Sequence, residues 1–134
     1  MDTPKTPGPP KLERIKVANL DQLAGRRVYI AGKYRSSNGT SVLENVRLAE
    51  RVAIACARAG VHYFCPHLNT AWMSGDGNHA GVAPNDFFLA ADLDWLAVSQ
   101  DILMIPGWGG SPGARGELKF ARLALLGLYE LGDV

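Results

Sequence analysis

Four short apolar runs recur along the chain, separated by longer segments of mixed polarity. They are residues 27–31, 61–65, 101–105 and 128–131. Compact apolar runs of this length, bounded by glycine, proline or polar residues, are typical of strands buried in a parallel sheet. We therefore predict four strands that are covered by other elements.

The segments between these runs predict three helices. In the first, apolar residues recur every three or four positions, and Ser41 with Glu44 forms a capping box at its start. Gly60 ends this helix as its C-terminal cap. The second helix is expected over residues 85–99. The third begins at Ser111, because Ser followed by Pro is a strong signal for a cap and a first helical turn.

Strands that alternate with helices predict one small doubly wound α/β domain of the Rossmann-like or flavodoxin-like type. We expect residues 26–134 to form it around a parallel sheet of four or five strands, with the four runs in the order 2-1-3-4. Residues 1–25, which begin MDTPKTPGPP, are expected to be a disordered or partly ordered N-terminal arm. Residues 66–84 predict a long loop, and such loops are usually lids or binding loops.

The predicted strand order also predicts where a ligand binds. In such sheets the site lies beyond the carboxyl ends of the strands at which the order reverses, here the first and third. The loops at residues 32–35 and 107–116 should therefore form one pocket. The second loop is rich in glycine and leads into a helix N-terminus, whose N–H groups and dipole favour an anion or a sugar phosphate.

Composition and charge disfavour several classes of function. A net charge of +1 gives no electrostatic footprint for a nucleic acid polymer or a membrane surface, and no signal peptide or membrane-spanning apolar run is present. Cys56, Cys65 and the three histidines lack metal-ligand spacing, so we expect no metal and a reduced, cytoplasmic setting. The glycine loop matches neither a Walker motif nor the dinucleotide fingerprint, which disfavours ATP hydrolysis and NAD chemistry, and we expect no cofactor.

Glu117 is the leading candidate for chemistry. It lies one to one and a half turns into the third helix, close to the glycine loop. A carboxylate near a helix N-terminus should stay ionised, as a nucleophile requires. The alternative is that the helix dipole alone favours a solvated Glu at this position.

Asp92 is the second candidate carboxyl. Its neighbours one turn away are apolar, namely Phe88, Leu89, Trp95 and Leu96. Burial among them would raise the pKa of Asp92 and prepare it as a proton donor or as a partner of a nucleobase. Alternatively Asp92 only rims the core, and Asp86 or Asp94 competes with it for this position.

Other residues near the predicted pocket are expected to bind substrate. Gly32 and Arg35 follow the first strand, and Arg35 is either a phosphate ligand or a surface charge. Tyr29 either donates a hydrogen bond to Glu117 or is only a core aromatic. Trp108, inside the glycine loop, either lines a pocket for a base or packs against the core.

Three blocks of this sequence, VYIAGKYR, ADLDWL and DILMIPGWGGSPGARGELKFA, together resemble the nucleoside 2-deoxyribosyltransferase-like superfamily. The pattern GW-x-x-S-x-GA-x-x-E is most similar to small bacterial and phage proteins of that superfamily, and the spacing of the blocks is also similar to the 2′-deoxynucleoside 5′-phosphate N-hydrolases. The resemblance implies Glu117 as the nucleophile, Asp92 as the acid that serves the leaving base, and Tyr29 as the active-site tyrosine. It also implies phosphate contacts at Arg35, Ser111 and Gly113.

The activity that this resemblance implies is cleavage of the N-glycosidic bond of a nucleoside, a deoxynucleoside or its 5′-monophosphate. The reaction would pass through a glycosyl ester of the nucleophile, with water or a second base as acceptor. No evident match exists for the C-terminal segment through which transferases complete a neighbouring site, which favours a hydrolase. The resemblance further implies a homodimer or higher homo-oligomer. From another class, a nucleotide-binding or sensing module would keep the pocket without turnover, since fold does not determine function.

Overall fold

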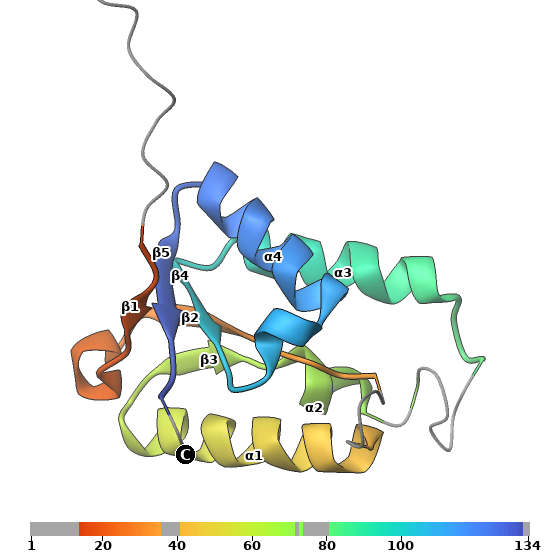
Figure 1. The fold of residues 1–134 in the computed structure, drawn as a ribbon, viewed down its shortest axis with the longest axis horizontal. Coiled ribbons are helices and arrows are strands. Elements are labelled where there is room, and N and C mark those ends of the chain that lie inside the picture. Colours follow the sequence, from red (N-terminus) through yellow and green to blue (C-terminus); the bar gives the residue numbers. More distant parts are fainter. Residues whose placement is uncertain (1–13, 36–40, 72, 74–80, 133–134) are drawn as a thin grey trace, which may run out of the picture.

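The structure, a computed structural model, describes residues 14–35, 41–71, 73 and 81–132. Five parallel strands form one sheet in the order β1-β5-β4-β2-β3 (Figure 1). They are β1 (Lys16–Val17), β2 (Arg27–Ala31), β3 (His62–Phe64), β4 (Asp101–Met104) and β5 (Gly127–Glu130). This is a doubly wound α/β domain of the Rossmann-like or flavodoxin-like type, as predicted.

The four predicted strands lie in the predicted order, and the structure adds β1 at the edge of the sheet. Lys16 is in register with Tyr129 of β5, and the amide of Ala18 donates to the carbonyl of Glu130 at 2.8 Å. Part of the expected N-terminal arm therefore belongs to the sheet, and residues 1–13 of that arm lie outside the described residues. The pairing supplies hydrogen-bond partners to backbone groups along the edge of β5. The sequence did not predict β1, because a strand of two residues is too short to show an alternation of polar and apolar positions.

Helices cover both faces of the sheet. α1 (Val42–Arg58), α2 (Pro66–Thr70) and the short η1 (Leu20–Leu23) lie on one face, and α3 (Asn85–Ala97) and α4 (Pro112–Leu123) lie on the other (Figure 1). Right-handed crossovers between parallel strands produce this division. Among the described helices, none has both the length and the apolar composition needed to cross a bilayer.

The predicted helix caps are confirmed. The hydroxyl of Ser41 accepts a hydrogen bond from the amide of Glu44 at 3.1 Å, and Gly60 follows α1 with a φ of 78°. A left-handed φ of this kind is natural for glycine and strained for other residues. The hydroxyl of Ser111 accepts from the amide of Ala114 at 3.2 Å and so caps α4.

The segment predicted as a long loop over residues 66–84 begins with a helix instead. α2 starts at Pro66, whose missing N–H and restricted φ suit a first helical position. The hydroxyl of Thr70 donates to the carbonyl of Pro66 at 2.9 Å and closes this single turn. Residues 72 and 74–80 of the segment lie outside the described residues. α3 ends at Ala97, two residues before the predicted end of that helix at residue 99.

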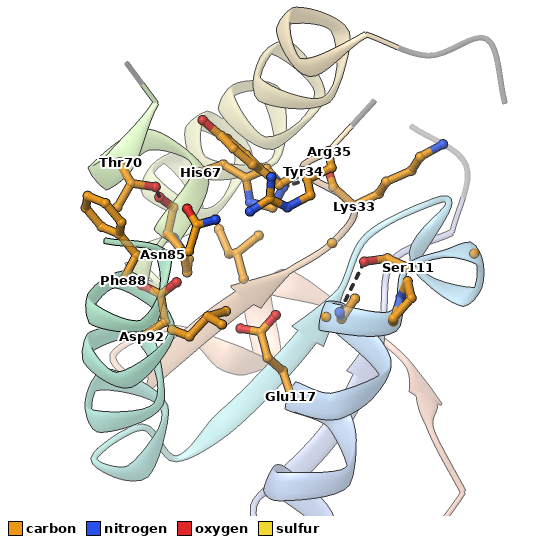
Figure 2. A pocket seen from close by; sticks show the side chains of 18 residues that line it. Lys33, Tyr34, Arg35, His67, Thr70, Asn85, Phe88, Asp92, Ser111 and Glu117 are labelled. Atoms are coloured by element: carbon orange, nitrogen blue, oxygen red, sulfur yellow. Dashed lines mark hydrogen bonds between the residues drawn. The ribbon is translucent and has the colours of Figure 1, made fainter. Parts of the chain in front are cut away.

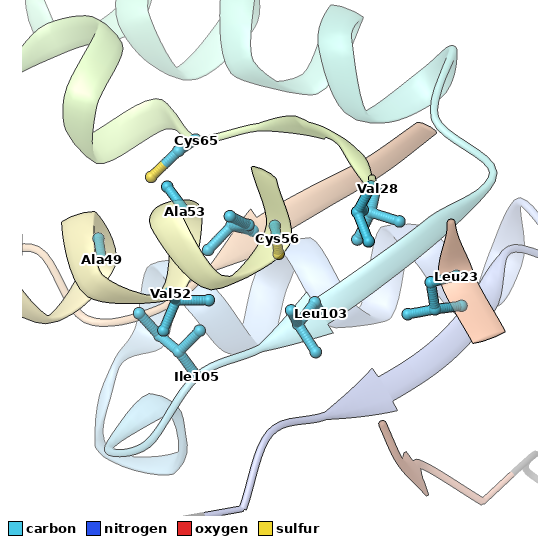
Figure 3. Close-up of a cluster of buried hydrophobic side chains, with 11 residues drawn as sticks. Leu23, Val28, Ala49, Val52, Ala53, Cys56, Cys65, Leu103 and Ile105 are labelled. Atoms are coloured by element: carbon cyan, nitrogen blue, oxygen red, sulfur yellow. The ribbon is translucent and has the colours of Figure 1, made fainter. Parts of the chain in front are cut away.

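The core consists of two apolar clusters, one on each face of the sheet, because side chains alternate along the strands. The cluster under α1 contains both cysteines and is drawn in Figure 3. Burial raises the pKa of Cys56 to about 11 and also raises that of Cys65, so both thiols stay protonated and act as small apolar side chains. The cluster under α3 and α4 contains Tyr29, Leu96 and Leu118. This cluster lies directly beneath the candidate site, because its Tyr29 contacts Glu117.

Candidate active site

A cavity of about 430 Å³ lies beyond the carboxyl ends of β2, β3 and β4. The loop after β2, the start of α2, one side of α3 and the N-terminus of α4 surround it (Figure 2). It lies at the reversal of strand order, where the sequence predicted a pocket. The loop at residues 32–35 and the start of α4 line it together, as expected.

Glu117 and Asp92 line this same cavity, one from α4 and the other from α3. Figure 2 shows both carboxyl groups projecting into the space between the two helices and the loop that carries Arg35. No ion pair involves either acid within the described part of the chain. Two acids thus share one site, which the cationic Lys33 and Arg35 also line.

Glu117 is held from below by Tyr29, whose hydroxyl donates a hydrogen bond to the Glu117 carboxylate. Burial raises the pKa of Glu117 to about 7, the Tyr29 hydrogen bond partly opposes this rise, and the charge of Asp92 adds to it. The structure therefore opposes the prediction that Glu117 stays ionised, because burial favours its protonated form. The dipole acts mainly within the first turn, whereas Glu117 lies in the second, where burial dominates.

Tyr29 lies beneath the site and does not line the cavity. It is fully buried, and burial together with the nearby Glu117 carboxylate raises its pKa, so the phenol remains a donor. The sequence offered Tyr29 as a core aromatic or as a hydrogen-bond donor to Glu117, and its side chain is both. It does not reach the space that a substrate would occupy.

Asp92 faces the cavity, whereas Asp86 and Asp94 are exposed. Burial raises the pKa of Asp92 to about 6, in the predicted direction. The predicted apolar surroundings are correct for the buried Phe88 and Leu96. Leu89 also lines the cavity beside Asp92 although it is largely exposed, and Trp95 is largely exposed and does not line it, because α3 is apolar around its circumference and only one side meets the sheet.

Four of the predicted substrate-binding residues line the cavity, namely Gly32, Arg35, Ser111 and Gly113. A Cβ at Gly32 would lie 2.4 Å from Cγ1 of Ile105, so the close approach of two chain segments requires glycine there. Gly113 and Ser111 lie at the N-terminus of α4, where backbone N–H groups face the opening.

Trp108 does not line this cavity, contrary to the prediction. Gly107 adopts a φ of 91° and turns the chain into η2 (Trp108–Gly110). The tryptophan packs against the cluster under α4 and lines a separate, more open cavity with Val17 and Glu130. A left-handed residue changes the direction of the next side chain, and this change cannot be read from the glycine count alone.

Sequence reasoning missed His67, which lines the cavity from α2 and is 4 % exposed. Its Nε2 lies 2.8 Å from the carbonyl oxygen of Lys33, and burial lowers its pKa, so the ring is neutral. The histidines were considered only as metal ligands. The position of His67 just after β3, at the same edge of the sheet as Gly32, was the signal that would have found it. Within the described residues, no group of three or more His, Cys, Asp or Glu side chains could hold a metal ion.

No protein-family model matches this sequence, and no curated protein matches it. A solved structure of similar fold is the crystal structure of a conserved protein from Enterococcus faecalis V583, with a TM-score of 0.54 and 16 % sequence identity. The alignment covers 80 % of this chain and 63 % of that one, so this chain spans less than two thirds of the other protein. At this identity the similarity establishes a shared fold alone. Fold and site together define a doubly wound α/β domain with two carboxyl groups in its switch-point cavity.

Proposed function

We propose that this protein cleaves the N-glycosidic bond of a nucleoside, a deoxynucleoside or its 5′-monophosphate. The observation that supports this most is the pair of carboxyl groups, Glu117 and Asp92, that open onto one cavity from successive helices. Glycoside cleavage uses two carboxyl groups, one as nucleophile or base and one as acid. The resemblance of the sequence to the nucleoside 2-deoxyribosyltransferase-like superfamily assigns these roles to the same two residues.

In the proposed reaction the Glu117 carboxylate attacks C1′ of the sugar as the bond from C1′ to the base nitrogen breaks. The electron pair leaves with the base, which takes the proton of Asp92, and a glycosyl ester forms on Glu117. Water then attacks C1′ and returns a proton to Asp92, which releases the sugar and the Glu117 carboxylate. In a transferase, a second base takes the place of that water. Tyr29 orients Glu117 throughout by its hydrogen bond.

A phosphorylated substrate is favoured by groups that line the cavity. Arg35 and the N-terminus of α4, with Ser111 and Gly113, can contact a phosphate there. Asp92 lies on α3 with Phe88, so the leaving base is expected on the α3 side. The sugar would then lie between the two carboxyl groups.

A second candidate is a nucleotide-binding module without turnover, and the similar titration of the two acids favours it. Burial raises the pKa of Asp92 to about 6 and that of Glu117 to about 7, and the charge of Asp92 adds to the rise at Glu117. Attack by Glu117 with proton donation by Asp92 requires an ionised Glu117 beside a protonated Asp92, and two acids that titrate over the same range do not by themselves provide that distribution. Turnover would depend on a substrate that establishes it.

The experiment that separates the two candidates incubates the protein with deoxynucleosides, ribonucleosides and their 5′-monophosphates and measures free base by chromatography. The proposal expects release by the wild type, loss with Glu117→Gln and reduced release with Asp92→Asn. Asp94→Asn is the matched control, because Asp94 is an exposed acid on the same helix. Binding by calorimetry without release supports the binding module. Addition of a second base, with detection of a new nucleoside, distinguishes transfer from hydrolysis.

The expected homo-oligomer remains a proposal that α3 supports. Exposed apolar side chains of α3 include Phe87, Leu89, Leu93 and Trp95, and Val98 follows directly after the helix; each is between 38 % and 61 % exposed. An apolar surface of this kind usually has a partner, and we expect a second copy of the chain. Light scattering should give twice the mass of one chain, and Val98→Glu should lower it to one. A single-chain mass for the wild type would contradict the proposal.

A further inference from the structure

Three successive backbone carbonyls after β2 accept hydrogen bonds from two buried side chains. His67 Nε2 lies 2.8 Å from the carbonyl oxygen of Lys33. Asn45 Nδ2 donates to the carbonyl of Tyr34 at 3.1 Å and to that of Arg35 at 3.3 Å. Because these residues have left the sheet, the ladder no longer supplies donors for them, and side chains from α1 and α2 take over.

The role of His67 follows from its partner. A carbonyl oxygen can only accept, so Nε2 must carry the hydrogen and Nδ1 carries the lone pair of the neutral ring. Nδ1 is buried and has no hydrogen-bond partner among the described residues. The edge-on packing of Tyr34 against the imidazole, with ring centroids 5.4 Å apart, further restricts the ring. His67 therefore acts as a fixed donor to the loop.

Asn45 and His67 are both buried polar side chains, which require hydrogen-bond partners inside the protein. Asn45 is 6 % exposed and His67 is 4 % exposed. A buried amide or imidazole is unfavourable unless it is hydrogen-bonded, and an apolar residue at position 45 would continue the apolar face of α1. Among the described residues, the side-chain hydrogen bonds of Asn45 and His67 go to the segment from Lys33 to Arg35.

That segment carries two of the cations of the cavity, Lys33 and Arg35, both of which line it. A long cationic side chain binds a phosphate well only if its backbone is held in place, because ordering it otherwise reduces the affinity. We propose that Asn45 and His67 are positioning residues that set the preference of this cavity for a phosphorylated substrate by holding the backbone from Lys33 to Arg35. This inference rests on the proposed function.

The test compares each nucleoside with its own 5′-monophosphate. Asn45→Leu and His67→Phe keep the approximate side-chain volume and remove the donors, so each should raise KM for the monophosphate about tenfold relative to KM for the nucleoside. For Asn45→Leu, which alters no residue of the cavity lining, KM for the unphosphorylated nucleoside and kcat should stay within about twofold. His67→Gln keeps an N–H donor and should restore most of the monophosphate affinity. Equal rises in KM for both substrates, or no change for either, would overturn the proposal.

A double-mutant cycle tests whether Asn45 acts through Arg35. Arg35→Ala should remove the preference for the monophosphate, and Asn45→Leu should then add no further effect. Independent, additive effects would contradict the positioning role. Asn45→Ser is a milder variant for the same cycle if Asn45→Leu does not fold, which circular dichroism will show.

A result against the proposed function can be told apart from one against this inference. If the wild type releases no base from any substrate, the same ratios are measured as Kd for the nucleoside and its monophosphate by calorimetry. A selective tenfold loss for the monophosphate would then support the positioning role although catalysis is absent. If the wild type binds both ligands equally, or neither, the positioning role fails.

Discussion

The acids at the two ends of the sheet have opposite environments. Asp101, at the amino end of β4, is 1 % exposed and accepts two hydrogen bonds from Arg26, Nε to Oδ2 at 2.6 Å and Nη2 to Oδ1 at 3.1 Å. At the carboxyl end, Glu117 accepts from the neutral phenol of Tyr29, and no ion pair involves Glu117 or Asp92 among the described residues. The buried Asp101 thus has a bidentate cation partner, whereas the two partly buried acids of the cavity form no ion pair with a described residue.

This difference separates a structural acid from candidate functional ones. The paired acid joins the segment before β2 to β4, and β5 packs so closely on it that a Cβ at Gly127 would lie 2.2 Å from Oδ1 of Asp101. The two acids of the cavity have raised pKa values, and burial is the largest cause for each. A carboxyl group whose ionised form is disfavoured in this way is typical of sites that move protons or form covalent bonds.

The largest expected effect comes from Glu117→Gln, which should lower the rate of base release at least about 10³-fold.

The Glu117→Gln change should also stabilise the protein. The folded pKa of about 7 lies above the ordinary value of 4.5, so stability falls as pH rises from 4.5 to 7 and stays lower above it. At pH 8 the variant should therefore gain up to about 3 kcal/mol in free energy of unfolding, and at pH 4 almost nothing. Urea unfolding at both pH values measures this, and a loss of stability at pH 8 would contradict it.

Asp101→Asn should act in the opposite direction and destabilise the protein without changing the chemistry of the site. It leaves Arg26 without its anion, and because the Arg26 side chain is 43 % exposed, we expect a loss of about 2 kcal/mol rather than the larger loss of a fully buried pair. Glu50→Gln, which breaks the exposed pair with Arg47, is the control and should change stability by less than about 0.5 kcal/mol. Equal losses in free energy of unfolding for Asp101→Asn and Glu50→Gln would show that the buried and the exposed ion pair contribute equally to stability.

The pH dependence of kcat/KM should be bell-shaped, with limbs near pH 6 and pH 7. Below about 6 both Asp92 and Glu117 are protonated and no nucleophile is present, and above about 7 both are ionised and no proton donor remains. Initial rates between pH 4.5 and 9 will show the two limbs. A rate that does not fall above pH 8 would mean that no acid of this pair donates the proton.

The smallest expected effect is that of Tyr29→Phe. The Tyr29 hydrogen bond lowers the pKa of Glu117, so its loss should move that pKa above about 7 and shift the upper limb of the profile to higher pH. The rate near neutral pH should fall several-fold, because less of Glu117 is ionised and its carboxylate is less restricted. An unchanged profile would show that the hydrogen bond does not tune Glu117.

Much of the fold could be predicted from local patterns. The four apolar runs, the caps at Ser41 and Ser111, and the glycine after α1 specify elements through interactions within a few residues. The order of the four strands then follows from the doubly wound class, and the handedness of their connections determines the face on which each helix lies. β1 and α2 were missed because each is short and has no periodicity of its own; β1 exists only through its pairing with β5.

The sequence by itself also determined where the pocket lies, since the carboxyl ends of neighbouring parallel strands open onto the same edge of the sheet. The residues alone left open whether Asp92 faces that pocket or only rims the core, and the tertiary structure decided that it faces the pocket with Glu117. Only the tertiary structure decided that Trp108 turns away from the cavity, that Asn45 and His67 hold the loop before Arg35, and that Glu117 titrates near pH 7. The physical reason is that side-chain direction, hydrogen-bond partners and desolvation depend on atoms brought together from distant parts of the chain. Patterns along the sequence predict only the interactions between residues that are close together in the chain.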